Sequence, residues 1–183
     1  MGVYGKILLE GRMKLSKKKK VLFRISVGLN IFLIAIVALG IIKMNFVKEQ
    51  VFVTEVQSNL VELEGLIANQ IDDNWSEPNL VTTKLGDVLN GIWLGMTTGN
   101  QLGMLSESDN DILEQLYSKL NQYPNDELYR FVDLTEEDKK NFEELRDTLR
   151  EVGLGLNITI TPNMDSFINQ TEKLNEKIKY PLY

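Results

Sequence analysis

The chain contains neither cysteine nor histidine among its 183 residues. The absence of cysteine excludes disulfide bonds, thiol nucleophiles and thiolate metal ligands. The absence of histidine excludes a serine-histidine-aspartate triad and an imidazole that changes charge near neutral pH. Carboxylates are then the main groups left for catalysis. We therefore expect a protein that is not an enzyme, with no catalytic residues, no cofactor and no metal site.

The carboxylates form no recognisable ligand motif. Asp109, Asn110 and Asp111 resemble the start of a calcium-binding loop. Such a loop requires glycine at its sixth position and glutamate at its twelfth, where this chain has Glu114 and Leu120. We therefore reject a calcium site at this position.

Polar residues are almost absent from residues 21–42, where only Arg24 and Asn30 are costly to place in lipid. A helix of these 22 residues is about 33 Å long, enough to cross a hydrocarbon core of about 30 Å. Arg24 can extend to the headgroups, whereas Asn30 would lie deep in the lipid. The run predicts a single transmembrane helix. Asn30 is its candidate intramembrane contact with a partner, or else one tolerated polar residue.

The two sides of this run carry opposite charge. Before residue 43 there are eight Lys and Arg against one Asp or Glu, and from residue 43 onward there are 12 against 25. Because Lys and Arg mark the cytoplasmic side of a span, we expect a basic cytoplasmic stub at residues 1–20, a signal anchor at 21–42 and an acidic extracytoplasmic domain at 43–183. Residues 13–17 have the form of a bacterial start, so translation from Met1 or from Met13 stays open, as does the presence of residues 1–12.

A cleaved signal peptide is the competing interpretation. The apolar region of a signal peptide is usually about 7–15 residues long and ends at a small-x-small site. Here the run is longer, and residues 43–46 after it contain no such site. We therefore favour an uncleaved, single-pass anchor in the cell membrane, in contact with lipid.

Apolar spacing and helix-end residues predict a mainly α fold after the transmembrane helix. We expect an antiparallel bundle of about four to five helices over residues 45–71, 80–98, 106–124, 135–152 and 163–179, the third capped by Ser106 or Ser108. Residues 154–161 alternate apolar and polar side chains, and residues 128–133 do so more weakly. A minor two-stranded β element is therefore added, and whether 154–161 is a strand is left open.

The first of these helices has a broad apolar side, which includes Phe46, Val53, Val56 and Leu60. The spacing suits either a coiled coil or a helix of a bundle. Because the apolar side is wide, we favour a helix that packs inside the domain.

The second helix contains Gly91, Gly95, Gly99 and Gly103 at steps of four, with Trp93 among them. Such a stripe allows another backbone to approach closely, although each glycine inside a helix costs about 1 kcal/mol relative to alanine. These five residues are the candidate partner or close-packing surface, and we favour a tight crossing inside the domain. Leucine at Gly91 or Gly95 is expected to clash, and alanine to be tolerated.

The preferred function is that of a noncatalytic, membrane-anchored interaction or assembly protein, for example an accessory subunit of a membrane complex. Its expected partners are another membrane or extracytoplasmic protein or a second copy of the chain, and not nucleic acid. The alternative is an extracytoplasmic ligand-binding module that signals through a partner membrane protein, with its site at Trp93 and the glycine-lined helix. A carboxylate-dependent hydrolase is the third hypothesis, because two acids distant in sequence can meet in a fold.

A retained anchor predicts that the natural protein stays in the membrane fraction with residues 21–42 intact, as mass spectrometry of the purified chain can show. A mature N-terminus immediately after Ala38 or Gly40 would instead identify a cleaved signal peptide. The same spectrum tests a start at Met13, because peptides from residues 1–12 would be absent if translation began there.

Overall fold

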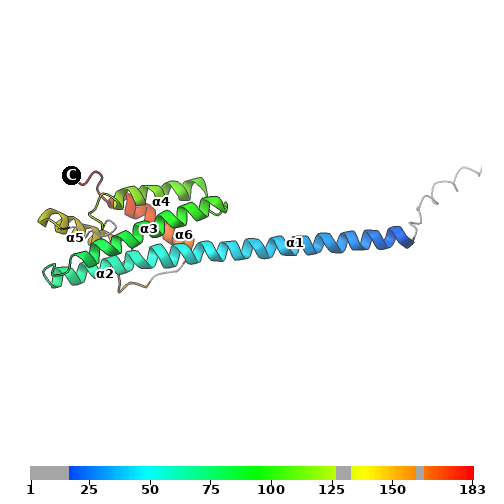
Figure 1. Cartoon of the computed structure of the whole chain (residues 1–183), viewed down its shortest axis with the longest axis horizontal. Helices are drawn as coiled ribbons and strands as arrows, with labels where there is room; N and C mark the ends of the chain where they lie inside the picture. The colour runs from blue at the N-terminus through cyan, green and yellow to red at the C-terminus, as the bar shows by residue number, and fades with distance from the viewer. Residues whose placement is uncertain (1–16, 127–132, 160–162) are drawn as a thin grey trace, which may run out of the picture. The chain divides into compact units, whose positions relative to one another are not determined.

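The computed structural model describes residues 17–126, 133–159 and 163–183, and the chain in these ranges is mainly helical (Figure 1). It divides into two compact units, residues 1–43 and 44–183. The prediction of a mainly α protein with one long apolar helix near its N-terminus is confirmed.

Helix α1 covers Lys17–Val51 and contains the whole apolar run of residues 21–42. None of its side chains is buried, and large apolar residues such as Phe23 and Ile34 are 66% and 68% exposed. Within the described residues this is the one helical stretch that is long and apolar enough to cross a membrane. Apolar surface of this extent is stable only when lipid or another chain covers it.

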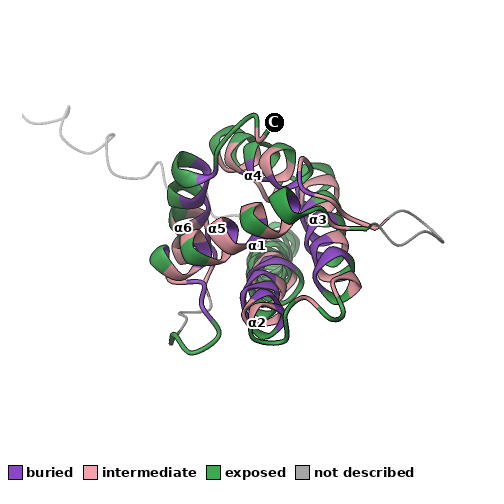
Figure 2. Cartoon of the chain, turned by 90° about the vertical axis from the view of Figure 1, so that its left-hand side faces the viewer, coloured by how far each residue is buried: buried purple, intermediate pink, exposed green. Residues whose placement is uncertain are grey.

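Unit 2 begins at Met44 inside α1 and continues through a π-helix and five further α-helices in the described residues. Their bounds are η1 Phe52–Gln57, α2 Ser58–Asp72, α3 Asn79–Gln101, α4 Glu107–Leu120, α5 Glu136–Glu151 and α6 Met164–Lys177. Helix α2 packs on α3, α3 on α4, α4 on α6, α6 on α5, and α5 again on α2, while η1 contacts α3 and α6. Their buried residues face one another and their exposed residues face outward (Figure 2).

Aromatic side chains lie at two places in this core. The rings of Phe52 and Phe167 are stacked with centroids 6.3 Å apart. Phe142 lies between Tyr123 and Trp75, with centroid distances of 5.4 and 6.2 Å. Burial raises the pKa of the Tyr123 hydroxyl far above its ordinary value, so this group stays neutral.

The helix ends follow from residues that can be read in the sequence. Ser106 caps α4, since its Oγ accepts a hydrogen bond from the Asp109 N–H at 3.0 Å. Thr135 and Asp138 form a reciprocal capping box at the start of α5. Gly153 follows α5 with φ of +87°, a left-handed conformation that favours glycine at this position. The predicted cap of the third bundle helix is confirmed at Ser106.

The π-helix η1 was not predicted, and it changes which residues of the first helix reach the core. A π turn holds more residues than an α turn, so side chains that precede it rotate away from the face that follows it. Phe52 and Val56 are buried, whereas Phe46 is 65% exposed and Val53 is half-buried. The prediction that Phe46 and Val53 belong to the apolar core is therefore wrong.

Two side chains satisfy carbonyl groups within η1. The Ser58 hydroxyl donates to the Val53 carbonyl at 2.9 Å, and the Asn59 amide donates to the Glu55 carbonyl at 2.8 Å. Widening of a helix disturbs its regular hydrogen bonds, and polar side chains one turn later can bind the affected carbonyls. Ser58 and Asn59 thus stabilise the π geometry locally.

The predicted strand at residues 154–161 is not formed in its described part, residues 154–159. Here the backbone N–H groups bind within turns and to a side chain. Leu154 donates to the Leu149 carbonyl at 2.8 Å, Ile158 donates to Gly155 at 3.0 Å, and Leu156 donates to the Glu64 carboxylate at 2.8 Å. These bonds occupy backbone N–H groups that a strand would need for hydrogen bonds to a neighbouring strand. Residues 128–132 of the other predicted strand lie outside the described residues, and Asp133 is not in a strand.

A buried carboxylate connects this turn segment to α2 and α5. The Glu64 side chain is only 1% exposed. Its Oε1 lies 3.3 Å from Arg146 Nε and 3.1 Å from Arg150 Nη1, and its Oε2 accepts the bond from Leu156. Both carboxylate oxygens are therefore engaged in holding three parts of the chain together.

Replacement of Glu64 by alanine should lower the free energy of unfolding of the detergent-solubilised full chain by about 2–3 kcal/mol, because it removes charge-assisted bonds from a buried site. Glu62→Ala is the matched control on the same helix. Glu62 is 56% exposed and pairs with Lys84 at the surface, so its loss should cost less than about 1 kcal/mol. Equal effects of the two substitutions in denaturant titrations would contradict the assigned role of Glu64.

Candidate functional site

Gly91 and Gly95 lie where α3 crosses η1. A Cβ atom at Gly91 would be 2.4 Å from the Glu55 carbonyl oxygen, and one at Gly95 would be 2.6 Å from the Phe52 ring. Both distances are shorter than real Cβ contacts allow, so only glycine permits this approach. The two glycines serve a close crossing inside unit 2. The expectation that alanine is tolerated at Gly91 is wrong for this geometry, because the backbone carbonyl of Glu55 occupies the space.

The other two glycines of the stripe have different roles. Gly99 faces Leu105, whose Cδ1 would lie 2.7 Å from an added Cβ. Gly103 follows the end of α3 with φ of +62°, and an added Cβ there would have no neighbour within 4 Å in the part of the chain that the structure describes. The regular spacing therefore combines three helical packing positions with one helix-ending residue, so it does not form one continuous surface.

The outward side of α3 carries two large exposed apolar residues, Trp93 at 57% and Leu94 at 50% exposed. Gly86, Asn90 and Thr97 fall on the same side by helical spacing. We name these five residues the α3 face. An added Cβ at Gly86 would have no neighbour within 4 Å among the described residues, so their packing does not require glycine there. Sequence analysis identified Trp93 but missed Leu94 and Gly86. Gly86 was missed because it lies outside the repeat of glycines at steps of four.

A cleft of ≈ 400 Å³ borders the α3 face on the side of η1 and α2. Its lining residues are Glu55, Asn59, Asp87, Asn90, Gly91 and Leu94. The cleft therefore combines carboxylates and amides with one exposed leucine. It adjoins the crossing that Gly91 makes possible.

Acidic groups outnumber basic groups around this cleft. Lys84 Nζ lies 2.8 Å from Glu62 Oε2 and 3.4 Å from Asp87 Oδ2, and Glu55 forms no ion pair within the described ranges. The hydrogen bond to Glu62, together with the charge of Asp87, raises the pKa of the Lys84 ammonium, so this lysine stays cationic. One lysine thus neutralises part of the charge of three carboxylates, and the cleft keeps a net negative charge.

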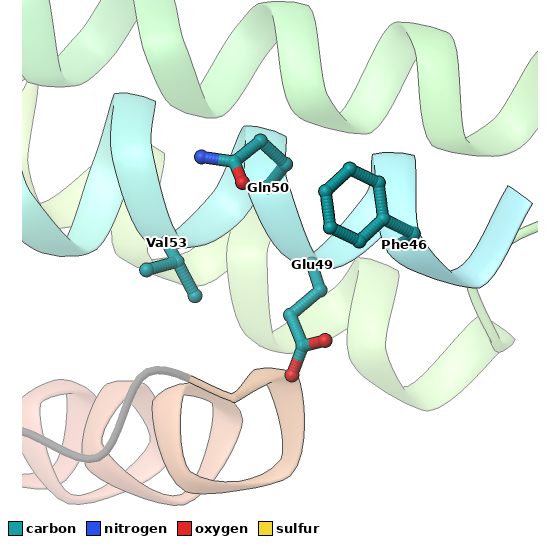
Figure 3. A pocket seen from close by; sticks show the side chains of 4 residues that line it. All are labelled: Phe46, Glu49, Gln50 and Val53. Carbon is teal, nitrogen blue, oxygen red and sulfur yellow. The ribbon is translucent and has the colours of Figure 1, made fainter. Parts of the chain in front are cut away.

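A second hollow lies on the last turns of α1 and the start of η1. It measures ≈ 230 Å³ and is lined by Phe46, Glu49, Gln50 and Val53. In Figure 3 the Glu49 side chain extends away from Phe46 and Gln50, toward the first turn of α6. Because four residues of one helical segment cannot surround a ligand, this hollow is a poor binding pocket.

Asn30, the predicted intramembrane contact, lies on α1, whose side chains are all unburied. Its Nδ2 donates to the Ser26 carbonyl at 2.9 Å, one turn earlier in the same helix. This bond uses one of the two amide hydrogens and lowers the cost of placing Asn30 in lipid. The remaining amide groups keep the capacity for a bond to another helix.

Comparisons with protein-family models, curated proteins and solved structures give no match to this chain.

The close crossing predicts opposite effects of alanine at two glycines of one helix. Gly91→Ala should lower the free energy of unfolding of the full chain by about 1–3 kcal/mol, because its methyl group meets the Glu55 carbonyl. Gly86→Ala should raise the same quantity by up to about 1 kcal/mol, because it improves helix propensity without a clash. Thermal and denaturant unfolding followed by circular dichroism measures both. A Gly91→Ala protein as stable as the parent would refute the close crossing.

Proposed function

We propose that this chain is a noncatalytic, membrane-anchored interaction or assembly protein that acts as an accessory subunit of a membrane complex. The observation that carries the proposal is the apolar run of residues 21–42, whose side chains are all exposed in α1 and which four lysines precede. A lipid bilayer is the environment that such a run fits. The exposed pair Trp93 and Leu94 on unit 2 supports a further contact with protein.

The proposed orientation places residues 1–20 in the cytoplasm and residues 43–183 outside the cell membrane. The charge difference between the two sides of the run supports this orientation. We further propose that the outer domain is an antiparallel bundle. The closed order in which α2, α3, α4, α6 and α5 contact one another supports this arrangement.

A ligand-binding module is the second candidate, because the ≈ 400 Å³ cleft lies beside Gly91 on the glycine-lined helix. Glu55 and Asp87 also line this cleft together, as the hydrolase hypothesis requires of two acids. The Lys84 ion pair with Asp87 and the exposed Leu94 are more typical of a protein contact surface than of a catalytic pair. We therefore rank interaction first.

The proposal predicts that chemical cross-linking in intact membranes yields discrete adducts of this chain with another membrane or surface protein. Asn30→Leu should lower the yield of adducts formed through the span if the amide bonds to a partner helix. Ile34→Leu is the matched control, because it keeps an apolar side chain in the same helix. The absence of any protein adduct of the membrane-embedded chain would contradict an assembly role.

A further inference from the structure

The α3 face combines exposed apolar surface with a glycine that destabilises the helix, and the packing of unit 2 explains neither feature. Trp93 and Leu94 expose large apolar surfaces, and Gly86 weakens the helix although an added Cβ there would meet no described atom within 4 Å. A second helix packed along α3 would bury both apolar residues and use the space above Gly86. Exposed apolar anchors together with small residues on one helix face fit the recognition of a helix in a groove.

The charge of the adjoining cleft restricts the chemistry of such a helix. Glu55 and Asp87 line the cleft beside Leu94, and Lys84 offsets only part of the local negative charge. A partner that brings Lys or Arg to this edge would complete ion pairs with the two carboxylates. We propose that the α3 face and its cleft bind a basic amphipathic helix of a partner protein, whose apolar side packs on Trp93 and Leu94 and whose cations pair with Glu55 and Asp87. This inference rests on the proposed interaction function.

Charge argues against the two simpler occupants of the surface. In a symmetric dimer the same patch would meet itself, which would bring the Glu55 and Asp87 carboxylates of the two copies close together. A bilayer that contains anionic lipids would repel the same carboxylates, and they would have to lose water to enter the interface. A cationic helix avoids both costs.

Photo-cross-linking of the full chain in its native membrane tests the inference. The photoreactive residue p-benzoylphenylalanine replaces Asn90, which lines the cleft and leaves Trp93, Leu94, Glu55 and Asp87 unchanged. We expect an adduct that mass spectrometry maps to an amphipathic, Lys- or Arg-bearing segment of another protein. Its yield should fall as salt concentration rises, because the proposed ion pairs are exposed.

Charge reversal supplies the matched comparison. Glu55→Lys with Asp87→Lys should lower the yield of this adduct about tenfold, the factor expected for loss of two exposed ion pairs. Glu172→Lys with Glu176→Lys makes the same charge change at two exposed residues of α6 and should leave the yield unchanged. Equal melting temperatures of the two double variants would show that the loss is not caused by unfolding.

Each other outcome overturns the inference. Adducts only with lipid, or only with a second copy of the chain, would show a different occupant, and an adduct that survives the Glu55 and Asp87 reversal would refute the charge pairing. A photoreactive residue at Ile34, in the apolar run, separates this failure from a failure of the proposed function. A protein adduct from position 34 without one from position 90 would refute the α3 surface and keep an interaction role. No protein adduct from either position would contradict both.

Discussion

The close approach of Gly91 to the Glu55 carbonyl is the contact on which the arrangement of unit 2 depends. With only hydrogen on the Gly91 α-carbon toward η1, the two helices approach backbone to backbone, and Phe52 fits beneath Gly95. Phe52 in turn stacks on Phe167 of α6, so the crossing fixes the position of a third helix. The same orientation of α3 turns Trp93 and Leu94 outward. One contact therefore determines both the packing inside unit 2 and the surface that it presents.

Buried polar groups make this packing specific. Glu64 binds two arginines of α5 and the backbone of Leu156, which fixes the segment after α5 against α2. Such a cluster is costly to desolvate, and removal of one partner leaves an uncompensated buried charge. Since both Glu64 oxygens are occupied, this carboxylate is a structural element and has no free oxygen for chemistry. The carboxylates of Glu55 and Asp87, by contrast, line an open cleft beside the α3 face.

The sequence was sufficient for features that depend on local chemistry. Residues 21–42 form an almost entirely apolar run, and Ser106, Thr135 and Gly153 begin or end helices through local geometry, so these features could be predicted. The π-helix could not, because residues 52–57 have no distinct composition and the π turn is formed together with its crossing partner α3. Residues 154–159 alternate like a strand, but the carboxylate that binds the Leu156 N–H comes from Glu64, 92 residues earlier. The glycine repeat predicted where the crossing lies but not the exposed face beside it. The sequence alone does not show which side of α3 a neighbouring helix covers.

An outward-facing helical domain held by a lipid-embedded helix is the arrangement that we propose, and the absence of native cysteine allows it to be measured directly. Single cysteines at Lys18, Ile34 and Glu172 would report the three regions through their reaction with a membrane-impermeant maleimide. In intact cells we expect labelling at position 172 alone, labelling at position 18 only after permeabilisation, and none at position 34 until detergent is added. Labelling of position 34 in undisturbed membranes, or protection of position 172 until permeabilisation, would contradict the arrangement.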